Sequence, residues 1–277
     1  MKTILIINDN SAEAKHAAEF VLAIAQKVQA NILLGNIFIN EFAPVKKVPA
    51  GVISENEIEE LLTPDLPQHL RILNSTQSLF KPEIEEVDIS NINETEVAGL
   101  INKNNIWMMV KGVPPVLSER HAQNNLNVQT ILNKVLCPLL LIPANWELKD
   151  LERLVYIADL RYCRIQIVRY LAEIARSWNA DLSIAHLSAK GLPDMAEKYA
   201  LSVFNDEVFR NVNYDRLLFN NIRERDLTTA VDVIINGMRN DLLVLVNHRF
   251  HFEEILGPYI PDNLPDFITI PLLIFPF

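Results

Sequence analysis

The sequence predicts an α/β protein of two tandem doubly wound, Rossmann-like domains, each with a parallel five-stranded sheet. Three observations support this fold class. Strands and helices alternate along the chain, the strands are strongly apolar, and the second half repeats the first. A length of 277 residues suits two domains, and we expect them to comprise residues 1–146 and 147–277.

The internal repeat consists of four segments of the first half that recur in the same order in the second. The offsets between matched segments are 150, 150, 136 and 133 residues. The fall in offset predicts extra residues in the first half, and the Pro- and Gly-containing stretch 41–67 is the expected place for them. The matched segments are 3–9 with 153–159, 30–34 with 180–184, 104–110 with 240–246, and 138–143 with 271–276.

In the first half, a β-branched apolar run predicts a strand buried on both faces, and Ser11 then provides the N-cap of an Ala-rich helix. Alternating apolar and acidic residues predict a half-exposed strand further on. The expected strands are 3–8, 31–39, 83–89, 106–110 and 139–142. The expected helices begin after Ser11 and run to Val28, then cover 66–80, 93–102 and 128–135.

The second half repeats this order of elements. Its strongly apolar strands are typical of a parallel sheet covered by helices on both faces, where ligands bind beyond the carboxyl ends of the strands. The expected strands are 154–158, 181–186, 215–219, 242–246 and 272–275. The expected helices are 163–178, 194–204, 227–238 and a weak one at 252–256.

Composition excludes several classes of function. A formal charge of -10 and a pI of about 5.1 describe an acidic surface that repels nucleic acid. No apolar run is long enough to cross a membrane. The two cysteines, Cys137 and Cys163, have no metal-type spacing and too small a number for a disulfide framework. We therefore expect a cytoplasmic protein with neither a nucleic-acid nor a membrane partner.

The order strand, Asp, Ala-rich helix, strand and, at the end, a Pro-flanked apolar strand resembles the universal stress protein superfamily in its tandem form. The resemblance spans nearly the whole chain. It implies an adenine nucleotide alpha hydrolase-like fold and a role in stress-response binding or regulation through an unidentified protein partner. It also implies that the closing strands, 138–143 and 271–276, pair within an internal pseudo-dimer or between chains in a homodimer.

Many members of that superfamily bind ATP through a loop after the fourth strand, with the pattern Gly, two residues, Gly, nine residues, Gly and Ser or Thr. Glycines let backbone N–H groups wrap phosphates without interference from a Cβ atom. The two loops of this chain contain only Gly112 and Gly257. The residues aligned with the pattern are Val110, Val113 and Gln123–Asn124 in the first half, and Val246, Arg249 and Tyr259–Ile260 in the second.

The missing glycines predict a protein that binds no cofactor and is not an enzyme. The alternative is an adenine-nucleotide-binding protein that holds ATP or AMP through a non-standard loop and hydrolyses it slowly at most. Asp9 and Asp159 match the superfamily's acidic position after the first strand, where adenosine is contacted. The simpler interpretation is that each carboxylate caps the following helix.

A third hypothesis is a metal or small-molecule module centred on His248 and His251. The two histidines are three residues apart, so one helical turn would place them on one face, with Glu254 or Asp262 as a third ligand. The competing interpretation is a solvated loop, which we favour because the equivalent stretch of the first half has no histidine.

Overall fold

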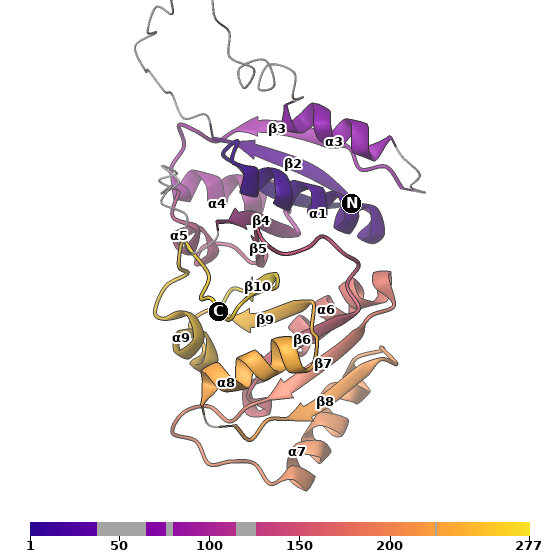
Figure 1. The fold of residues 1–277 in the computed structure, drawn as a ribbon, viewed down its shortest axis with the longest axis vertical. Coiled ribbons are helices and arrows are strands. Elements are labelled where there is room, and N and C mark those ends of the chain that lie inside the picture. Colours follow the sequence, from indigo (N-terminus) through magenta and orange to yellow (C-terminus); the bar gives the residue numbers. More distant parts are fainter. Residues whose placement is uncertain (38–64, 76–79, 115–125, 225) are drawn as a thin grey trace, which may run out of the picture.

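A computed structural model describes residues 1–37, 65–75, 80–114, 126–224 and 226–277 of the chain. Its strands form one ten-stranded sheet in the order β3-β2-β1-β4-β5-β10-β9-β6-β7-β8 (Figure 1). Within each half all five strands are parallel, and the halves join through the antiparallel pair β5 and β10. The predicted α/β class with two parallel five-stranded sheets is confirmed, and the two sheets are continuous.

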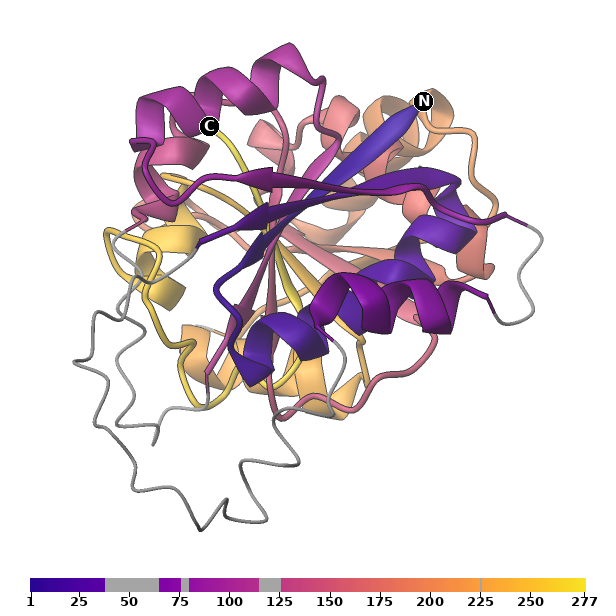
Figure 2. The same cartoon turned by 90° about the horizontal axis from the view of Figure 1, so that it is seen from above.

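The first half contains the elements from β1 to β5, with helices on both faces of the sheet. Figure 2 shows α4 on one face and α1 with α3 on the other. The strands are β1 (Lys2–Asn8), β2 (Ala30–Asn36), β3 (Ile84–Asp88), β4 (Met108–Val113) and β5 (Leu139–Pro143). The helices are α1 (Ala12–Val28), α3 (Leu66–Asn74), α4 (Glu94–Lys103) and α5 (Val128–Leu132).

The second half repeats the arrangement, with more irregular helices. The strands are β6 (Arg153–Ala158), β7 (Asp181–His186), β8 (Leu217–Asn221), β9 (Leu242–Val246) and β10 (Leu272–Phe275). The α-helices are α6 (Ile165–Trp178), α7 (Glu197–Val203), α8 (Leu227–Asp232) and α9 (Phe250–Leu256). Short 3₁₀ turns are η1 (Leu160–Tyr162) and η3 (Phe209–Asn211), and π-helical turns η2 (Phe204–Val208) and η4 (Val233–Gly237) continue α7 and α8.

Helix α1 shows how local sequence sets an element. The Ser11 side chain accepts a hydrogen bond from the Ala14 amide at 3.0 Å, as predicted for the N-cap. Most of the helix then faces the core through small or branched side chains, and Gln29 ends it in the left-handed conformation. Helix α4 begins with a complete capping box formed by Asn93 and Glu96.

The strand register corrects the predicted repeat by two residues. Ile4 of β1 lies opposite Met108 of β4, and the equivalent pair in the second half is Leu154 and Leu242. The offset at the fourth strand is therefore 134 residues rather than 136. Two apolar runs can be matched in more than one register by sequence, and only the backbone pairing distinguishes them. Gly112 consequently corresponds to Val246 instead of His248.

The extra residues of the first half lie between β2 and β3. The offset between halves is 150 residues at β2, where Ile32 corresponds to Leu182, and 133 residues at β3, where Ile84 corresponds to Leu217. The predicted excursion over 41–67 falls in this interval, although residues 38–64 lie outside the described residues. The same holds for 76–79, in the last part of the helix expected over 66–80.

Several helix boundaries differ from the prediction. The helix expected from Cys163 begins at Ile165, because a separate 3₁₀ turn, η1, precedes it. The helix expected over 128–135 ends at Leu132, and that expected from Asp194 begins at Glu197. The domain limits at 146 and 147 fall within 144–152, the connection between β5 and β6.

The seam between the halves is an apolar pairing of the two closing strands. Leu140 lies opposite Leu273, and this pair is flanked by Leu141 with Leu272 and Leu139 with Ile274. All six side chains are at most 1% exposed, and burial of each contributes roughly 1.5–3 kcal/mol. Each closing strand also has a parallel neighbour, β4 or β9, so both lie inside the sheet.

Polar and aromatic contacts reinforce the seam on both sides of the sheet. The Tyr170 ring of α6 stacks on Trp107 with centroids 4.7 Å apart, and its hydroxyl donates to the Trp107 carbonyl at 3.0 Å. On the other side, Gln129 Nε2 donates to Oδ1 of the fully buried Asn247 at 3.1 Å. Asn247 Nδ2 donates in turn to Asn133 Oδ1 at 2.9 Å. The two halves therefore share one core.

No helix among the described residues is long and apolar enough to cross a membrane.

Candidate functional site

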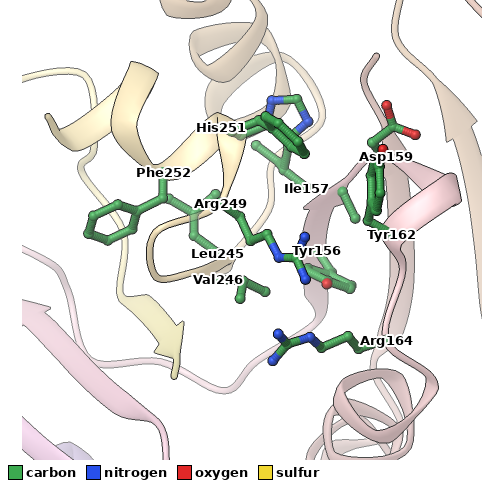
Figure 3. A pocket seen from close by; sticks show the side chains of 12 residues that line it. Tyr156, Ile157, Asp159, Tyr162, Arg164, Leu245, Val246, Arg249, His251 and Phe252 are labelled. Atoms are coloured by element: carbon green, nitrogen blue, oxygen red, sulfur yellow. The ribbon is translucent and has the colours of Figure 1, made fainter. Parts of the chain in front are cut away.

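The second half has a topological switch point between β6 and β9, which are neighbours in the sheet. The chain leaves β6 toward β7 on one side and leaves β9 toward β10 on the other. In open α/β sheets, ligands bind in the crevice beyond the strand ends at such a point. We call this hollow the switch crevice; it is lined by 156–159, Tyr162, Arg164, 245–246 and 249–252 (Figure 3).

The switch crevice is nearly filled by the chain's own side chains. It encloses about 30 Å³, which is space for one or two water molecules. A small-molecule site in a protein usually offers at least about 300 Å³. The volume of the switch crevice is therefore about one tenth of the lower limit for such a site.

Asp159 lies at the carboxyl end of β6 and is 3% exposed. Its two carboxylate oxygens accept both branches of the Arg161 guanidinium, from Nε at 2.8 Å and Nη2 at 2.7 Å. The amides of Arg161 and Ala189 add hydrogen bonds of 3.0 Å and 2.9 Å. Burial alone would raise the pKa of Asp159, but the hydrogen bonds from Arg161 and Ala189 outweigh it and lower the pKa below its ordinary value.

These contacts leave the Asp159 carboxylate with four donors from its own chain. The Arg161 amide is one of them, so Asp159 is the N-cap of the short turn η1, whereas α6 follows Arg164 and has no side-chain cap. Arg161 also donates to the Pro193 carbonyl at 3.2 Å, and Ala189 lies in the loop after β7. The Asp159–Arg161 pair thus fastens the loops that follow β6 and β7 to each other.

Asp9 occupies the equivalent position in the first half and is more exposed. Its Oδ1 accepts a hydrogen bond from the Ser11 amide at 3.1 Å and another from the Ser11 hydroxyl at 2.5 Å. Ser11, rather than Asp9, caps α1. Beside it, Asn8 Nδ2 donates to Asn36 Oδ1 at 2.7 Å, so buried amides connect the ends of β1 and β2.

The histidines of the second half do not form the predicted pair. Helix α9 begins at Phe250, so His248 lies before the helix, with a left-handed φ of 51°, and His251 lies within it. The exposed His248 contacts Gln129 Nε2 at 3.2 Å across the seam, whereas the buried His251 Nε2 donates to the Leu187 carbonyl at 3.0 Å. The described residues contain no group of three or more metal-ligating side chains.

A second buried histidine, His186, ends β7 beside Asp159. Its Nδ1 lies 3.3 Å from the Leu160 amide nitrogen, while Nε2 has no hydrogen-bond partner among the described residues. Burial lowers the pKa of both His186 and His251 and so favours the neutral form of each ring. His186 corresponds to Asn36 of the first half.

A larger hollow adjoins the switch crevice at the carboxyl ends of β7 and β8. This β7–β8 groove is lined by 187–194, 222–224, Leu227, His251 and Glu254 and has a volume of about 620 Å³. His251 lines both hollows. The fold therefore offers open space beside the switch point rather than at it.

Comparison with solved structures identifies the fold. A universal stress protein from Archaeoglobus fulgidus DSM 4304 matches with a TM-score of 0.61 at 12% identity, over 99% of this chain and 98% of that chain. A structure from Pseudomonas aeruginosa UCBPP-PA14, whose name assigns it to the same family, gives a TM-score of 0.52 at 11% identity and covers 100% and 93%. The chain has the universal stress protein fold.

The same fold occurs in the cytoplasmic domain of a prokaryotic cation chloride cotransporter. That structure matches with a TM-score of 0.51 at 9% identity, over 99% of this chain and 94% of that chain. No protein-family model and no curated protein matches the sequence. The likeness is therefore one of backbone architecture, as the low identities indicate.

The residues after the fourth strand can be compared between the halves only where the structure describes them. Gly112 lies in β4, against the backbone of Glu13 in α1, so its missing Cβ serves helix packing. The first-half positions Gln123–Asn124 lie outside the described residues. In the second half α9 follows β9 almost directly. The sequence analysis did not predict Arg161 or Arg164 as site residues. The spacing of Arg161, two residues after Asp159, could have indicated an ion pair between these two side chains.

Proposed function

We propose that this chain is a universal stress protein-like binding or regulatory protein that does not bind ATP through a phosphate loop and is not an enzyme. The observation that carries the proposal is the closed state of the switch crevice. Asp159 receives four donors from its own chain, and the remaining cavity holds about 30 Å³. The absence of a glycine triplet from both loops supports the same conclusion.

The nucleotide content of the purified protein tests this proposal. Mild denaturation followed by chromatography is expected to release far less than one ATP or AMP per chain. Calorimetric titration with ATP and with AMP is expected to show no saturable binding below the millimolar range. Stoichiometric copurified nucleotide, or steady ATP hydrolysis that rises with protein concentration, would contradict the proposal and favour the non-standard nucleotide site.

A second candidate is a ligand site in the β7–β8 groove, because a volume of about 620 Å³ falls within the range of small-molecule sites. The ligand in this groove would be a small molecule or an adenine nucleotide held without a phosphate loop. A Leu227→Trp substitution at the rim narrows the groove. If nucleotide or adenosine binds to the original protein and this variant weakens it at least tenfold, the second candidate replaces the first.

We further propose that the protein acts in the cytoplasm, with an unidentified protein as partner. Both cysteines are free thiols, and Cys137 is buried, which suits a reducing compartment. We expect the closing strands to pair within one chain, as an internal pseudo-dimer, and not between two chains. Each closing strand already has a neighbour on both sides in the sheet. Light scattering of the purified chain is expected to give one chain per particle; a dimer that dissociates on mutation of Leu140 would contradict this.

A further inference from the structure

The ten-stranded sheet ends at β8, which has no neighbour on its outer side among the described strands (Figure 1). Its inner side pairs with β7, where the Leu182 amide donates to the Arg216 carbonyl at 3.0 Å. At the other end of this pairing the Ile222 amide donates to the His186 carbonyl at 2.9 Å. Backbone groups along a strand point alternately to its two sides. The residues that direct their N–H and C=O groups away from β7 are therefore Leu217, Phe219 and Asn221.

The outer edge of β8 is uncharged and partly apolar. The strand, Leu217–Asn221, consists of two leucines, one phenylalanine and two asparagines. Leu218 is 45% exposed on one face of the sheet. On the other face Phe219 stacks on Phe204 with ring centroids 5.0 Å apart, and the ring of the exposed Phe209 lies 6.2 Å from that of Phe204. Exposed apolar side chains therefore flank the edge on both faces.

The opposite edge of the sheet, β3, is protected by charge. Three of its five residues are acidic, namely Glu85, Glu86 and Asp88. Natural edge strands carry charged residues that prevent pairing with another chain, and two copies of β3 would bring carboxylates together. A β3 strand placed against β8 would set these carboxylates beside apolar side chains, which is costly. The edge that can accept a further strand is thus β8, and β3 of another copy does not suit it.

The sequence of β8 is complementary to itself in one antiparallel register. A two-fold axis at Leu218 places this residue opposite its own copy, and Leu217 opposite Phe219 of the second copy. Because Leu217 and Phe219 both direct backbone groups outward, they can exchange N–H···O=C bonds in this register. The charged Asp215 and Arg216, which precede the strand, then face the uncharged asparagines at its end. Apolar residues meet apolar residues, and no like charges oppose each other.

We propose that β8 pairs with β8 of a second copy of this chain, antiparallel and about a two-fold axis, so that two ten-stranded sheets become continuous. An interface of one strand pair and its flanking side chains belongs to the weak class that buries less than about 1,200 Å². The chain is therefore single in dilute solution and dimerises as its concentration rises. This contact differs from the pairing of β5 with β10, which lies within one chain, and it does not depend on the proposed function.

Sedimentation equilibrium of the full chain tests the contact at concentrations from about 1 µM to about 1 mM, which cover the dissociation constants of weak complexes. A reversible equilibrium between one and two chains is expected. Leu218→Lys and Leu218→Glu should each weaken association at least about tenfold, because each sets two like charges opposite each other. An equal mixture of the two variants should restore the dimer, since opposite charges then meet at this position.

Ile72→Lys is the matched control, because Ile72 is an aliphatic residue of similar exposure, 58%, on α3 in the first half. This change should leave the equilibrium as it is, and circular dichroism checks that every variant keeps the fold. One chain per particle at all concentrations would overturn the inference. A dimer that Leu218→Lys does not weaken, or that the mixed variants do not restore, would overturn it as well. A dimer that dissociates on mutation of Leu140 instead would assign the contact to the closing strands.

Discussion

Gly112 in β4 lies so close to Glu13 in α1 that a β-carbon on the glycine would stand 2.2 Å from the Glu13 carbonyl oxygen. The obstacle is backbone, so neither partner can yield by changing a rotamer. This contact joins a strand to the first turn of the helix that covers it. Gly112 lies within the fourth strand of the first half, and its missing side chain serves this packing contact.

Substitution of Gly112 by Ala is therefore expected to lower the free energy of unfolding by about 3 kcal/mol or more. The matched control is Gly99→Ala in α4, where a β-carbon meets nothing within 4 Å. That change removes a flexible residue from a helix and is expected to stabilise the protein by about 0.5–1 kcal/mol. Urea denaturation of both variants measures the difference. Equal stability of the two variants would refute the packing explanation.

The Asp159–Arg161 pair predicts a specific effect on stability at neutral pH. Arg161→Ala leaves a buried carboxylate with only its backbone donors, and we expect a loss of about 2 kcal/mol in unfolding free energy. Arg210→Ala removes an exposed ion pair with Asp206 and should change stability by less than about 0.5 kcal/mol. Chemical denaturation at pH 7 compares them, and indistinguishable midpoints would show that the fork contributes nothing.

The same pair predicts the acid limb of the stability profile. The pKa of Asp159 is lowered from an ordinary value of 3.8, so its contribution is present above about that pH and is lost as the pH falls through the lowered value. Asp159→Asn is expected to flatten the profile in this acid range. A profile that keeps its slope in the variant would mean that other carboxylates account for acid denaturation.

Two buried histidines predict a loss of stability at mildly acidic pH. The folded pKa of His186 and of His251 is lowered from 6.5 by burial, so the unfolded chain binds more protons below that pH and stability falls as the pH drops. Replacement by His186→Asn, the residue of the first half, together with His251→Gln should reduce the slope between pH 7 and 5. Exposed His248→Gln serves as control, and an unchanged slope in the double variant would rule out both histidines.

The hydrogen bonds of Asn247 lead us to expect that the two halves stabilise each other. Its side chain is completely buried and hydrogen-bonds to Gln129 and Asn133 across the seam. Asn247→Ala leaves those partners unsatisfied and is expected to cost about 1–3 kcal/mol, whereas Asn236→Ala, which removes an exposed contact to Asp232, should cost far less. Both halves should still unfold in one transition, detected by circular dichroism. Two separate transitions in the unmodified chain would show that the halves are independent.

Much of the fold could be predicted because strands buried on both faces carry their signal in consecutive residues. The runs Ile4–Ile7 and Leu272–Phe275 are apolar at every position, and polar or Pro residues flank them. The internal repeat in addition predicted the same order of strands and helices in both halves. The register at β4 could not be predicted, since Ile106, Met108 and Val110 are all apolar and a shift of two residues preserves the inward and outward pattern.

The site was harder to predict because it depends on a helix that starts three residues late. The equivalent of Ala12 in the second half is Tyr162, and the turn η1 ends there before α6 begins. That delay places Arg164 before the helix, where it lines the switch crevice. Arg161 folds back on Asp159 because a short turn brings the two side chains together, and periodicity over longer windows does not detect such a contact. His248 and His251 are separated for a similar reason, because α9 begins between them, at Phe250.

The antiparallel pairing of β5 with β10 has a consequence for how the molecule meets its surroundings. Because all strands within a half are parallel, this single reversal points the carboxyl ends of β1–β5 and those of β6–β10 in opposite directions. Asp9 and Asp159 therefore stand at opposite rims of one sheet. The equivalent strand ends of the two halves therefore face away from each other, so no single rim of the sheet carries both.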